Sequence, residues 1–340
     1  MRKKISLKDI AKKVGVSTAL VSYVLNNQKE GRISKIVAQK IRDTAKELNY
    51  STNQIAKSLK TNKTYTIGLI VSDISNPFSS SLARIIEDEA AKSDYTVIFG
   101  SSDENAERSF KLINVLLDRQ VDGFIIAFAA DSEQQINYLQ GMEIPFVLID
   151  RYFPGMNVSH VAINNYRAAY MAVKHLIDNG NKRIGMVTYK STLVNLLDRK
   201  KGYIGALSDH NLLIEEDWIK EVGIGNNQEE IETAFDQLLS SPGKVEAVLF
   251  GSNILSTHGL KYINKHHIKV PDDLAIVSFD QSDASSLFYA PLTHIKQPLE
   301  EMGQLVTNIL LQVFDKNREI TQVNMDTDLI IGQSSLRTPL

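Results

Sequence analysis

Apolar residues near the start of the chain recur with the spacing of a short helix. From Leu7 to Val14 they occupy positions i, i+3, i+4 and i+7, which form one face of two helical turns. Ser6 precedes this stretch and Asp9 stands three residues later, the arrangement of a capping box. Gly15 follows, where helices commonly end in a left-handed residue. The pattern therefore predicts a helix that begins at Leu7 and ends at Val14.

A second helix is predicted directly after this one, with Ser17 as its cap. Its inward-facing positions hold the apolar residues Val21, Val24 and Leu25. Its outward-facing positions hold small or hydrogen-bonding side chains, namely Thr18, Ala19, Ser22, Tyr23 and Asn26. Two short helices joined by a glycine-containing turn predict a helix-turn-helix motif over residues 7–26, whose second helix enters the major groove of DNA. The small polar face suits close approach to base edges. An ordinary helical hairpin fits the same periodicity.

A third helix is predicted from about Ser34 to Leu48, where apolar residues again recur three or four positions apart. Three helices of this size can bury one small core. The following residues, 51–60, contain neither glycine nor proline and could form two helical turns from near Asn53. Because so short a helix is marginal alone in water, it would need a partner to form.

From Tyr65 onward, short apolar runs alternate with longer stretches of helical period. The runs typical of strands cover residues 66–71, 96–100, 124–128, 146–149, 184–188, 247–250 and 275–279. The stretches typical of helices cover residues 77–92, 105–119, 166–179, 199–209 and 229–239. This alternation predicts parallel sheets covered by helices.

The same region contains a faint internal repeat. Residues 66–70 (TIGLI) are similar to residues 183–187 (RIGMV), and residues 121–126 (VDGFII) are similar to residues 245–250 (VEAVLF). Two similar α/β lobes with a cleft between them follow from the repeat.

Charge is divided unevenly along this chain of 340 residues, whose net charge is -2. Residues 1–63 hold 15 Lys and Arg against four Asp and Glu, whereas residues 64–340 hold 23 against 36. A basic head on an acidic body is expected when one end meets a polyanion, so we interpret the head as a nucleic-acid-binding unit. A solvated lysine-rich surface is the alternative, but it accounts less well for charge so concentrated at one end.

The sequence lacks the signatures of several other protein classes. The absence of cysteine excludes disulfide scaffolds, thiol catalysis and cysteine–zinc sites. There is no phosphate loop, complete dinucleotide fingerprint or nucleophile elbow, so we expect no enzyme activity and no cofactor. His258, His266 and His267 do not have the spacing of a metal site. Without a long apolar run or an export signal, we expect a cytoplasmic protein with no membrane segment.

Several motifs in the head carry a family resemblance. They are SLKDIA at residues 6–11, GVS at 15–17, VSYVLN at 21–26 and ELNY at 47–50, followed by Asn53, Ala56 and Leu59. With these motifs the head resembles the DNA-binding domain of the lactose-repressor (LacI/GalR) family. The resemblance implies that the second helix reads the major groove and that Leu59, in a hinge helix, wedges into the minor groove. The DNA-binding residues are then expected to be Ser6, Ser17, Thr18, Ala19, Ser22, Tyr23, Asn26, Ala56, Leu59 and Lys60.

The rest of the chain is similar to the periplasmic-binding-protein-like core of that family, with two doubly wound parallel-sheet lobes. The resemblance implies a helix-turn-helix domain at residues 5–50, a hinge at 51–62 and an effector-binding core at 64–338. Within the core, the N-lobe is expected at about 64–163 and 294–322, and the C-lobe at about 165–292 and 324–338. The chain would cross between the lobes near Ile163–Asn165, Leu292–His294 and Val323–Asn324.

Polar residues follow several predicted strands, at the sheet edge where open α/β sheets bind their ligands. Asp150 and Arg151 follow one strand and resemble the pair of ribose-type sites, whose two charges bond neighbouring sugar hydroxyls. Arg199 is expected to open a helix, and it matches the effector-binding arginine of the family. The expected effector-binding residues are Phe78, Asp150, Arg151, Arg199, Asn253 and Asp280.

Other roles for these residues stay open. Asp280 could cap a helix, Phe78 could belong to the core, and Asp150 with Arg151 could form an ion pair that lines a loop. Ser252 and Asn253 stand where the family usually has Asn-Asp, so a ligand contact there is less firmly implied.

These features together predict a homodimeric transcription regulator, most simply a repressor, that binds double-stranded operator DNA. A small-molecule effector in the cleft, expected to be a sugar or sugar derivative, would switch its operator affinity. The alternative is a sugar-sensing binding protein, or a global regulator whose head or core contacts a protein partner. The hinge match at Leu59 favours the first reading, because a kinked duplex is what requires such a wedge.

Overall fold

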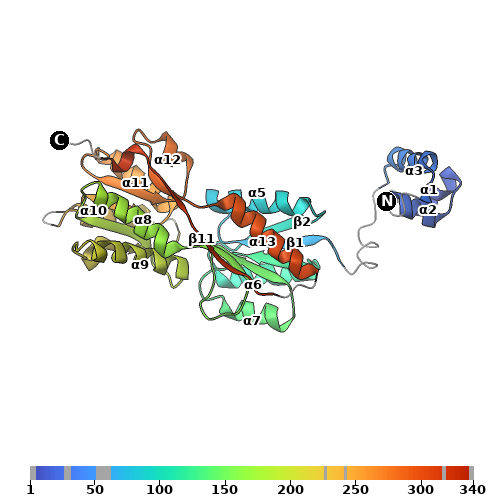
Figure 1. Cartoon of the computed structure of the whole chain (residues 1–340), viewed down its shortest axis with the longest axis horizontal. Helices are drawn as coiled ribbons and strands as arrows, with labels where there is room; N and C mark the ends of the chain where they lie inside the picture. Colours follow the sequence, from blue (N-terminus) through green and yellow to red (C-terminus); the bar gives the residue numbers. More distant parts are fainter. Residues whose placement is uncertain are drawn as a thin grey trace. The chain divides into compact units, whose positions relative to one another are not determined.

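The computed structural model of the chain describes residues 5–26, 32–50, 63–225, 228–240, 243–315 and 319–336. The chain divides into two compact units, Met1–Thr64 and Tyr65–Leu340 (Figure 1). None of the helices in the described ranges is long and apolar enough to cross a membrane.

In its described residues, the first unit is built on three short helices whose apolar faces meet. They are α1 (Leu7–Val14), α2 (Thr18–Leu25) and α3 (Lys35–Glu47). Their shared core consists of Ile10, Ala11, Val21, Val24, Ile41 and Ala45. The predicted turn is present, because Gly15 ends α1 with a φ of 80° and the Ser17 hydroxyl accepts the backbone N–H of Leu20 at the start of α2. The apolar spacing of the sequence is therefore realised as a helix-turn-helix.

The second unit contains two six-stranded sheets in its described residues. The N-lobe sheet has the order β11 (Gln322–Met325), β5 (His160–Ile163), β4 (Phe146–Ile149), β3 (Gly123–Ile126), β1 (Thr66–Val71) and β2 (Thr96–Ser101), with all pairs parallel. The C-lobe sheet has the order β12 (Asp328–Ile330), β10 (Thr293–Lys296), β9 (Ala275–Phe279), β8 (Ala247–Phe250), β6 (Ile184–Tyr189) and β7 (Ile219–Val222). Only the β10–β12 pair of this sheet is antiparallel.

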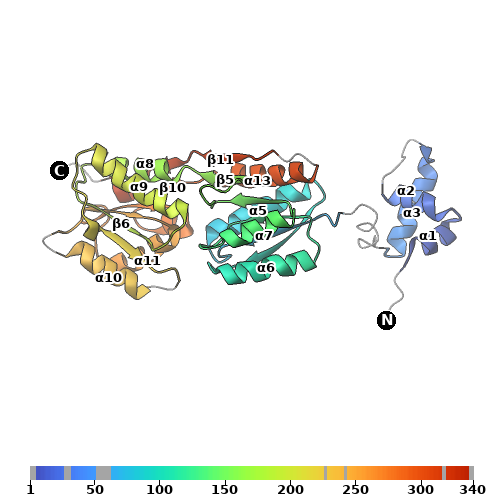
Figure 2. The same ribbon diagram turned by 90° about the horizontal axis from the view of Figure 1, so that it is seen from below.

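Helices cover both faces of each sheet (Figures 1 and 2). The N-lobe helices are α5 (Pro77–Ala91) and α13 (Leu299–Phe314) on one face, with α6 (Ala106–Asp118) and α7 (Glu133–Gly141) on the other. The C-lobe helices are α8 (Asn165–Asp178) and α9 (Val194–Asp209) on one face, with α10 (Gln228–Leu239) and α11 (Asn253–Lys265) on the other. The short α12 (Asp283–Leu287) follows β9. Strands such as β1, β3, β4 and β8 are buried and apolar along their length, which is why the sequence pattern predicted them. The strands β5, β7, β10, β11 and β12 contain polar residues and were not predicted.

The lobe boundaries differ from the expected ones at two of the three crossings. The first crossing runs from β5 to α8, between Ile163 and Asn165. The crossing expected at Leu292–His294 was placed wrongly, because β10 pairs with β9 and keeps the chain in the C-lobe as far as Lys296. The crossing expected at Val323–Asn324 was also wrong, because β11 pairs with β5 in the N-lobe as far as Met325. The N-lobe therefore comprises about residues 65–163 and 299–325.

The internal repeat marks equivalent strands of the two lobes. Residues 66–70 lie in β1 and residues 184–187 in β6, and both strands stand fifth in their sheets. The second pair of similar segments supplies β3 and β8, which both stand fourth. By the same correspondence, the ends of β4 and β9 are equivalent positions, and both face the space between the lobes.

Candidate functional site

A cavity of about 690 Å³ lies between the two lobes at the carboxyl ends of their strands. Its walls include Phe78, Glu104, Asp150 and Arg151 from the N-lobe, Asn195, Arg199 and Asp280 from the C-lobe, and Gln297 at the second crossing. Five of the six expected effector-binding residues thus line one cavity. Asn253 does not line it in the described residues. The strand-end rule for open α/β sheets accounts for this convergence.

Asp150 and Asp280 are equivalent residues of the two lobes. Each directly follows a strand, and each has a left-handed backbone, with φ of 66° and 65°. Each backbone N–H donates to the neighbouring strand, to the carbonyl of Val161 at 2.9 Å and of Ile295 at 3.0 Å. Burial raises the pKa of both carboxyl groups, although nearby arginines partly oppose this. The two lobes therefore present buried carboxylates to the same cavity.

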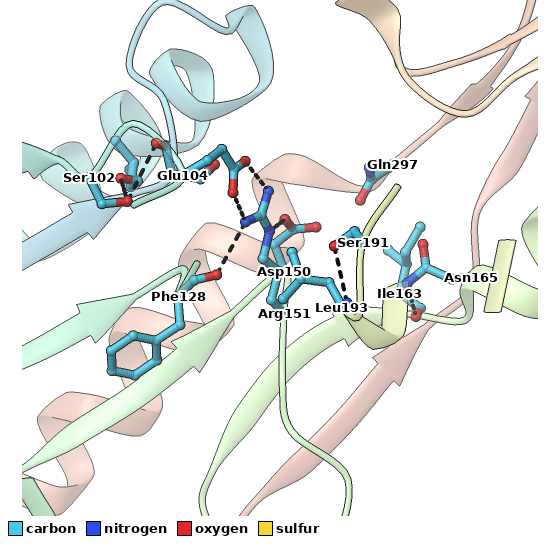
Figure 3. A network of polar contacts seen from close by, with 12 residues as sticks. Ser102, Glu104, Phe128, Asp150, Arg151, Ile163, Asn165, Ser191, Leu193 and Gln297 are labelled. Atoms are coloured by element: carbon cyan, nitrogen blue, oxygen red, sulfur yellow. Dashed lines mark hydrogen bonds and ion pairs between the residues drawn. The ribbon is translucent and has the colours of Figure 1, made fainter. Parts of the chain in front are cut away.

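Arg151 is held by the carboxylate of Glu104, a residue that no sequence pattern indicated. Its two terminal nitrogens donate to the two carboxylate oxygens of Glu104, each at 2.6 Å (Figure 3). Its Nη1 also donates to the carbonyl of Phe128 at 3.2 Å. Its Nε lies 3.4 Å from Oδ2 of Asp150. The expected pair of Asp150 and Arg151 is thus part of a cluster of three charged side chains, with Glu104 as the third.

Arg199 is a buried guanidinium without an ion pair among the described residues. It lies in the second turn of α9, which begins at Val194, so the expectation that Arg199 opens this helix was wrong. Its Nε donates to Oδ1 of Asn165 at 2.8 Å and its Nη1 to the carbonyl of Gly251 at 2.7 Å. The guanidinium stacks on the ring of Phe279, 4.0 Å from the ring centroid. Burial lowers the pKa of Arg199, and the Asp280 carboxylate opposes that effect.

Two further cavity residues carry buried oxygens that accept no hydrogen bond from the described residues. They are Oδ1 of Asn195 and Oε1 of Gln297. The amide nitrogen of Gln297 donates to Oδ1 of Asp280 at 2.6 Å, which orients the amide. Buried polar atoms almost always find a partner, so these oxygens indicate where water or the hydroxyl groups of a ligand would bind. Asn195 follows β6 closely enough for the strand-end rule to have found it, whereas Gln297 follows a strand that was not predicted.

Asn253 joins the lobes directly. Its Nδ2 donates to Oδ1 of Asn76 at 3.0 Å, and Asn76 belongs to the N-lobe. The same oxygen accepts the backbone N–H of Phe78 and so caps α5. Phe78 is half-buried, lines the cavity and packs against the main core, so it combines both roles considered for it. A change in the orientation of the lobes would therefore alter or break the hydrogen bond between Asn253 and Asn76.

The outer face of α2 forms the second candidate surface. Thr18, Ala19 and Asn26 are exposed there, and Ser22 and Tyr23 are half-buried. The amide of Asn26 donates to the carbonyl and the hydroxyl of Ser22.

The two serines predicted beside this face have local bonds. The Ser6 hydroxyl donates to the carboxylate of Asp9, and Ser17 caps α2. The expected hinge residues Ala56, Leu59 and Lys60 lie outside the described residues.

Two family models match the chain. The model "Bacterial regulatory proteins, lacI family" covers residues 6–53, and "Periplasmic binding protein-like domain" covers residues 173–335. The "HTH-type transcriptional repressor PurR" of Aliivibrio fischeri (strain MJ11) is 30% identical over 336 residues, with 97% of this chain and 98% of the relative covered.

Solved structures share the fold. The lac repressor dimer bound to operator and the anti-inducer ONPF has a TM-score of 0.87 at 21% identity and covers 98% of this chain and 100% of its own. A complex of the transcriptional regulator CelR with cellobiose has a TM-score of 0.73 at 22% identity, with coverage of 97% and 100%.

Proposed function

The chain belongs to the lacI family of bacterial regulatory proteins, and we propose that it is a repressor whose operator affinity is switched by a molecule bound between its lobes. It is a DNA-binding transcriptional regulator with a small-molecule effector. The observation that carries the proposed switch is the cavity shared by the lobes, into which Asp150 and Asp280 bring equivalent carboxylates. A ligand that contacts both lobes binds their two orientations unequally, and only such a difference in affinity can shift the equilibrium between them.

A sugar or sugar derivative fits the chemistry of this cavity best. The carboxylates of Asp150 and Asp280 and the free oxygens of Asn195 and Gln297 accept hydrogen bonds, while Arg199 donates. Vicinal hydroxyl groups can donate and accept at once, so a polyol satisfies such a wall. Among proteins of this fold, the CelR structure is a complex with cellobiose.

We assign the reading of DNA to the outer face of α2, with Thr18, Ala19, Ser22 and Tyr23 directed at base edges. The hinge residues Ala56, Leu59 and Lys60 would contact the minor groove, with Leu59 as the wedge that kinks it. The active species is a homodimer, as in the lac repressor dimer of the same fold. Effector binding would reorient the lobes, separate the two hinges and lower operator affinity.

The test selects DNA first and ligand second. Full-length protein is used to enrich binding sites from a random duplex library, and a panel of neutral sugars is then screened by thermal shift. A ligand of the folded core raises its melting temperature. We expect at least one sugar that raises the melting temperature and also changes affinity for the selected DNA. A library that yields no enriched sequence, or a sugar that binds without changing DNA affinity, contradicts the proposal.

Binding of the head to DNA is expected to weaken steeply with salt. Lysines such as Lys8, Lys12 and Lys35 are exposed on its helices, and each phosphate that they neutralise releases counterions. The slope of log affinity against log salt is roughly −0.9 per phosphate, so four contacts lower affinity about a hundredfold between roughly 50 and 200 mM salt. Fluorescence anisotropy with a labelled duplex measures this slope.

Single lysine variants provide the matched comparison for this measurement. Lys12→Ala is expected to reduce the slope by about one contact. Lys92→Ala, which removes an exposed lysine of the core, is expected to leave the slope unchanged. An affinity that stays constant over the salt range would show that the head does not bind through phosphates.

A further inference from the structure

Acidic side chains outnumber arginines among the described residues that line the cavity. Its described walls carry the acids Asp73, Asp103, Glu104, Asp150 and Asp280. They carry the arginines Arg108, Arg151 and Arg199. Arg108 is paired with Asp103, and Arg151 is paired with Glu104 and lies next to Asp150. An anion that entered the cavity would therefore meet unpaired acids and only one arginine that is not already in an ion pair.

Glu104 forms with the guanidinium of Arg151 the same two-bond contact that a phosphate group would form. A guanidinium binds carboxylate or phosphate best through two parallel N–H bonds, and Glu104 takes both, each at 2.6 Å (Figure 3). The Phe128 carbonyl accepts a further bond from Nη1, and Nε faces Asp150. Arg151 is only 9% exposed, so little of its guanidinium is open to a ligand.

The backbone around Glu104 is built to hold its side chain there. Asp103 and Glu104 are both left-handed, with φ of 50° and 56°, a conformation that residues with side chains seldom adopt. The backbone N–H of Glu104 donates to the carbonyl of Ser72 at 3.0 Å, which ties the loop to the end of β1. The loop is tied a second time where the N–H of Ser102 donates to the carbonyl of Val71. The Glu104–Arg151 contact is therefore a fixed part of the cavity wall.

We propose that Glu104 is a specificity-determining residue, which makes the cleft select an uncharged, hydroxyl-rich ligand and reject its phosphorylated form. The inference rests on the proposed function, because it assigns a ligand class to the same cleft. Glu104 acts in two ways: it saturates the donors of Arg151, and it adds a negative charge to a wall that already holds Asp150. A neutral polyol can still donate its hydroxyl protons to the carboxylates of Glu104 and Asp150. A phosphate group finds the terminal donors of Arg151 already taken and is repelled by the negative charge.

The first test measures binding of inorganic phosphate to the full-length protein by calorimetry and thermal shift, with chloride replaced at constant ionic strength. Wild type is expected to show no binding. Glu104→Gln removes the charge and frees donors of Arg151, so it is expected to bind phosphate at least tenfold more tightly than the limit of detection for wild type. Glu107→Gln, an exposed neighbour in the first turn of α6, is the matched control and should behave as wild type. Adding Arg151→Gln to Glu104→Gln should abolish the gain.

The second test uses wild type alone and decides the question if Glu104→Gln does not fold. D-glucose and D-ribose are each compared by calorimetry with glucose 6-phosphate and ribose 5-phosphate. No phosphorylated sugar is expected to bind more tightly than its parent. Phosphate binding by wild type, tighter binding of a phosphorylated sugar, or a folded Glu104→Gln protein without the gain would each overturn the inference.

The two proposals fail in different ways. A sugar that changes DNA affinity, together with a folded Glu104→Gln protein that gains nothing, contradicts only the role of Glu104. A phosphate gain in Glu104→Gln, without any sugar that affects DNA binding, supports the role of Glu104 and contradicts the proposed switch.

Discussion

Replacing Arg199 by alanine is expected to lower the affinity of the core for its effector ten- to a hundredfold. Arg199 is only 4% exposed and forms no ion pair among the described residues, so a ligand gains a charged donor that water does not screen. Removing such a partner costs about 1.5–3 kcal/mol, and every 1.4 kcal/mol is about tenfold in affinity. DNA binding without effector should be unchanged, because the head forms its own compact unit. The variant would therefore regulate without responding to the small molecule.

Asp280→Asn tests the same site with less disturbance of the fold. Burial raises the pKa of Asp280, so its folded form binds protons more readily than the unfolded chain does. The contribution of Asp280 to the free energy of unfolding therefore falls as pH rises through the raised pKa, because ionisation of the buried carboxyl group is unfavourable. A neutral amide at this position is thus expected to be tolerated at neutral pH. The amide also keeps an oxygen that can accept from Gln297.

A matched arginine variant completes this comparison. Arg183 pairs with Glu246 on the C-lobe surface and does not line the cavity, so Arg183→Ala should keep full effector affinity. Calorimetry with the sugar found by thermal shift gives the affinities. Unchanged affinity in both Arg199→Ala and Asp280→Asn would mean that the effector binds elsewhere.

The sequence predicted the strands that carry a continuous apolar run, the edge strand β2 among them, and missed strands of mixed polarity, including the buried inner strands β5 and β10. Strands such as β1, β8 and β9 are buried on both faces, so their apolar runs stand out. The strands β11 and β12 are short, partly exposed and mixed in polarity, so nothing in their residues marks them. With β10 also missed, two of the three lobe crossings were placed several residues early. The missed strands β10 and β11 thus became errors in the lobe boundaries.

The same reasoning separates the site residues that were predicted from those that were missed. Asp150 and Asp280 directly follow strong apolar strands, which makes strand ends easy to locate. Glu104 lies in a run of polar residues after β2, and only the two left-handed residues of that loop bring it onto Arg151. Hydrogen-bond partners so distant in sequence leave no local pattern. A single sequence therefore indicates the sheet edge more readily than the contacts across it.

Gly202→Ala is expected to destabilise the core by about 3 kcal/mol, the upper part of the usual range for overpacking. A Cβ at Gly202 would lie 2.2 Å from the carbonyl oxygen of Tyr166 and 3.0 Å from Cβ of Ala169. Both are parts of α8 that cannot move aside singly, so α9 would have to shift as a whole. The melting temperature should fall by roughly 6 °C or more for a domain of this size. Because α8 also carries Asn165, which holds Arg199, effector affinity should fall with stability.

Gly205→Ala, about one turn further along α9, is the control for Gly202→Ala. It shows whether any loss of stability comes from the clash with the backbone of α8 or from replacing a glycine of α9 as such. A Cβ there would meet only the hydroxyl end of Tyr166, at 2.3 Å, and this half-exposed side chain can swing away. Since alanine is favoured over glycine within helices by about 1 kcal/mol, Gly205→Ala should keep near wild-type stability. Thermal unfolding of the two variants by circular dichroism makes the comparison. Equal losses of melting temperature in both variants would contradict a specific need for glycine at the close contact between Gly202 and α8.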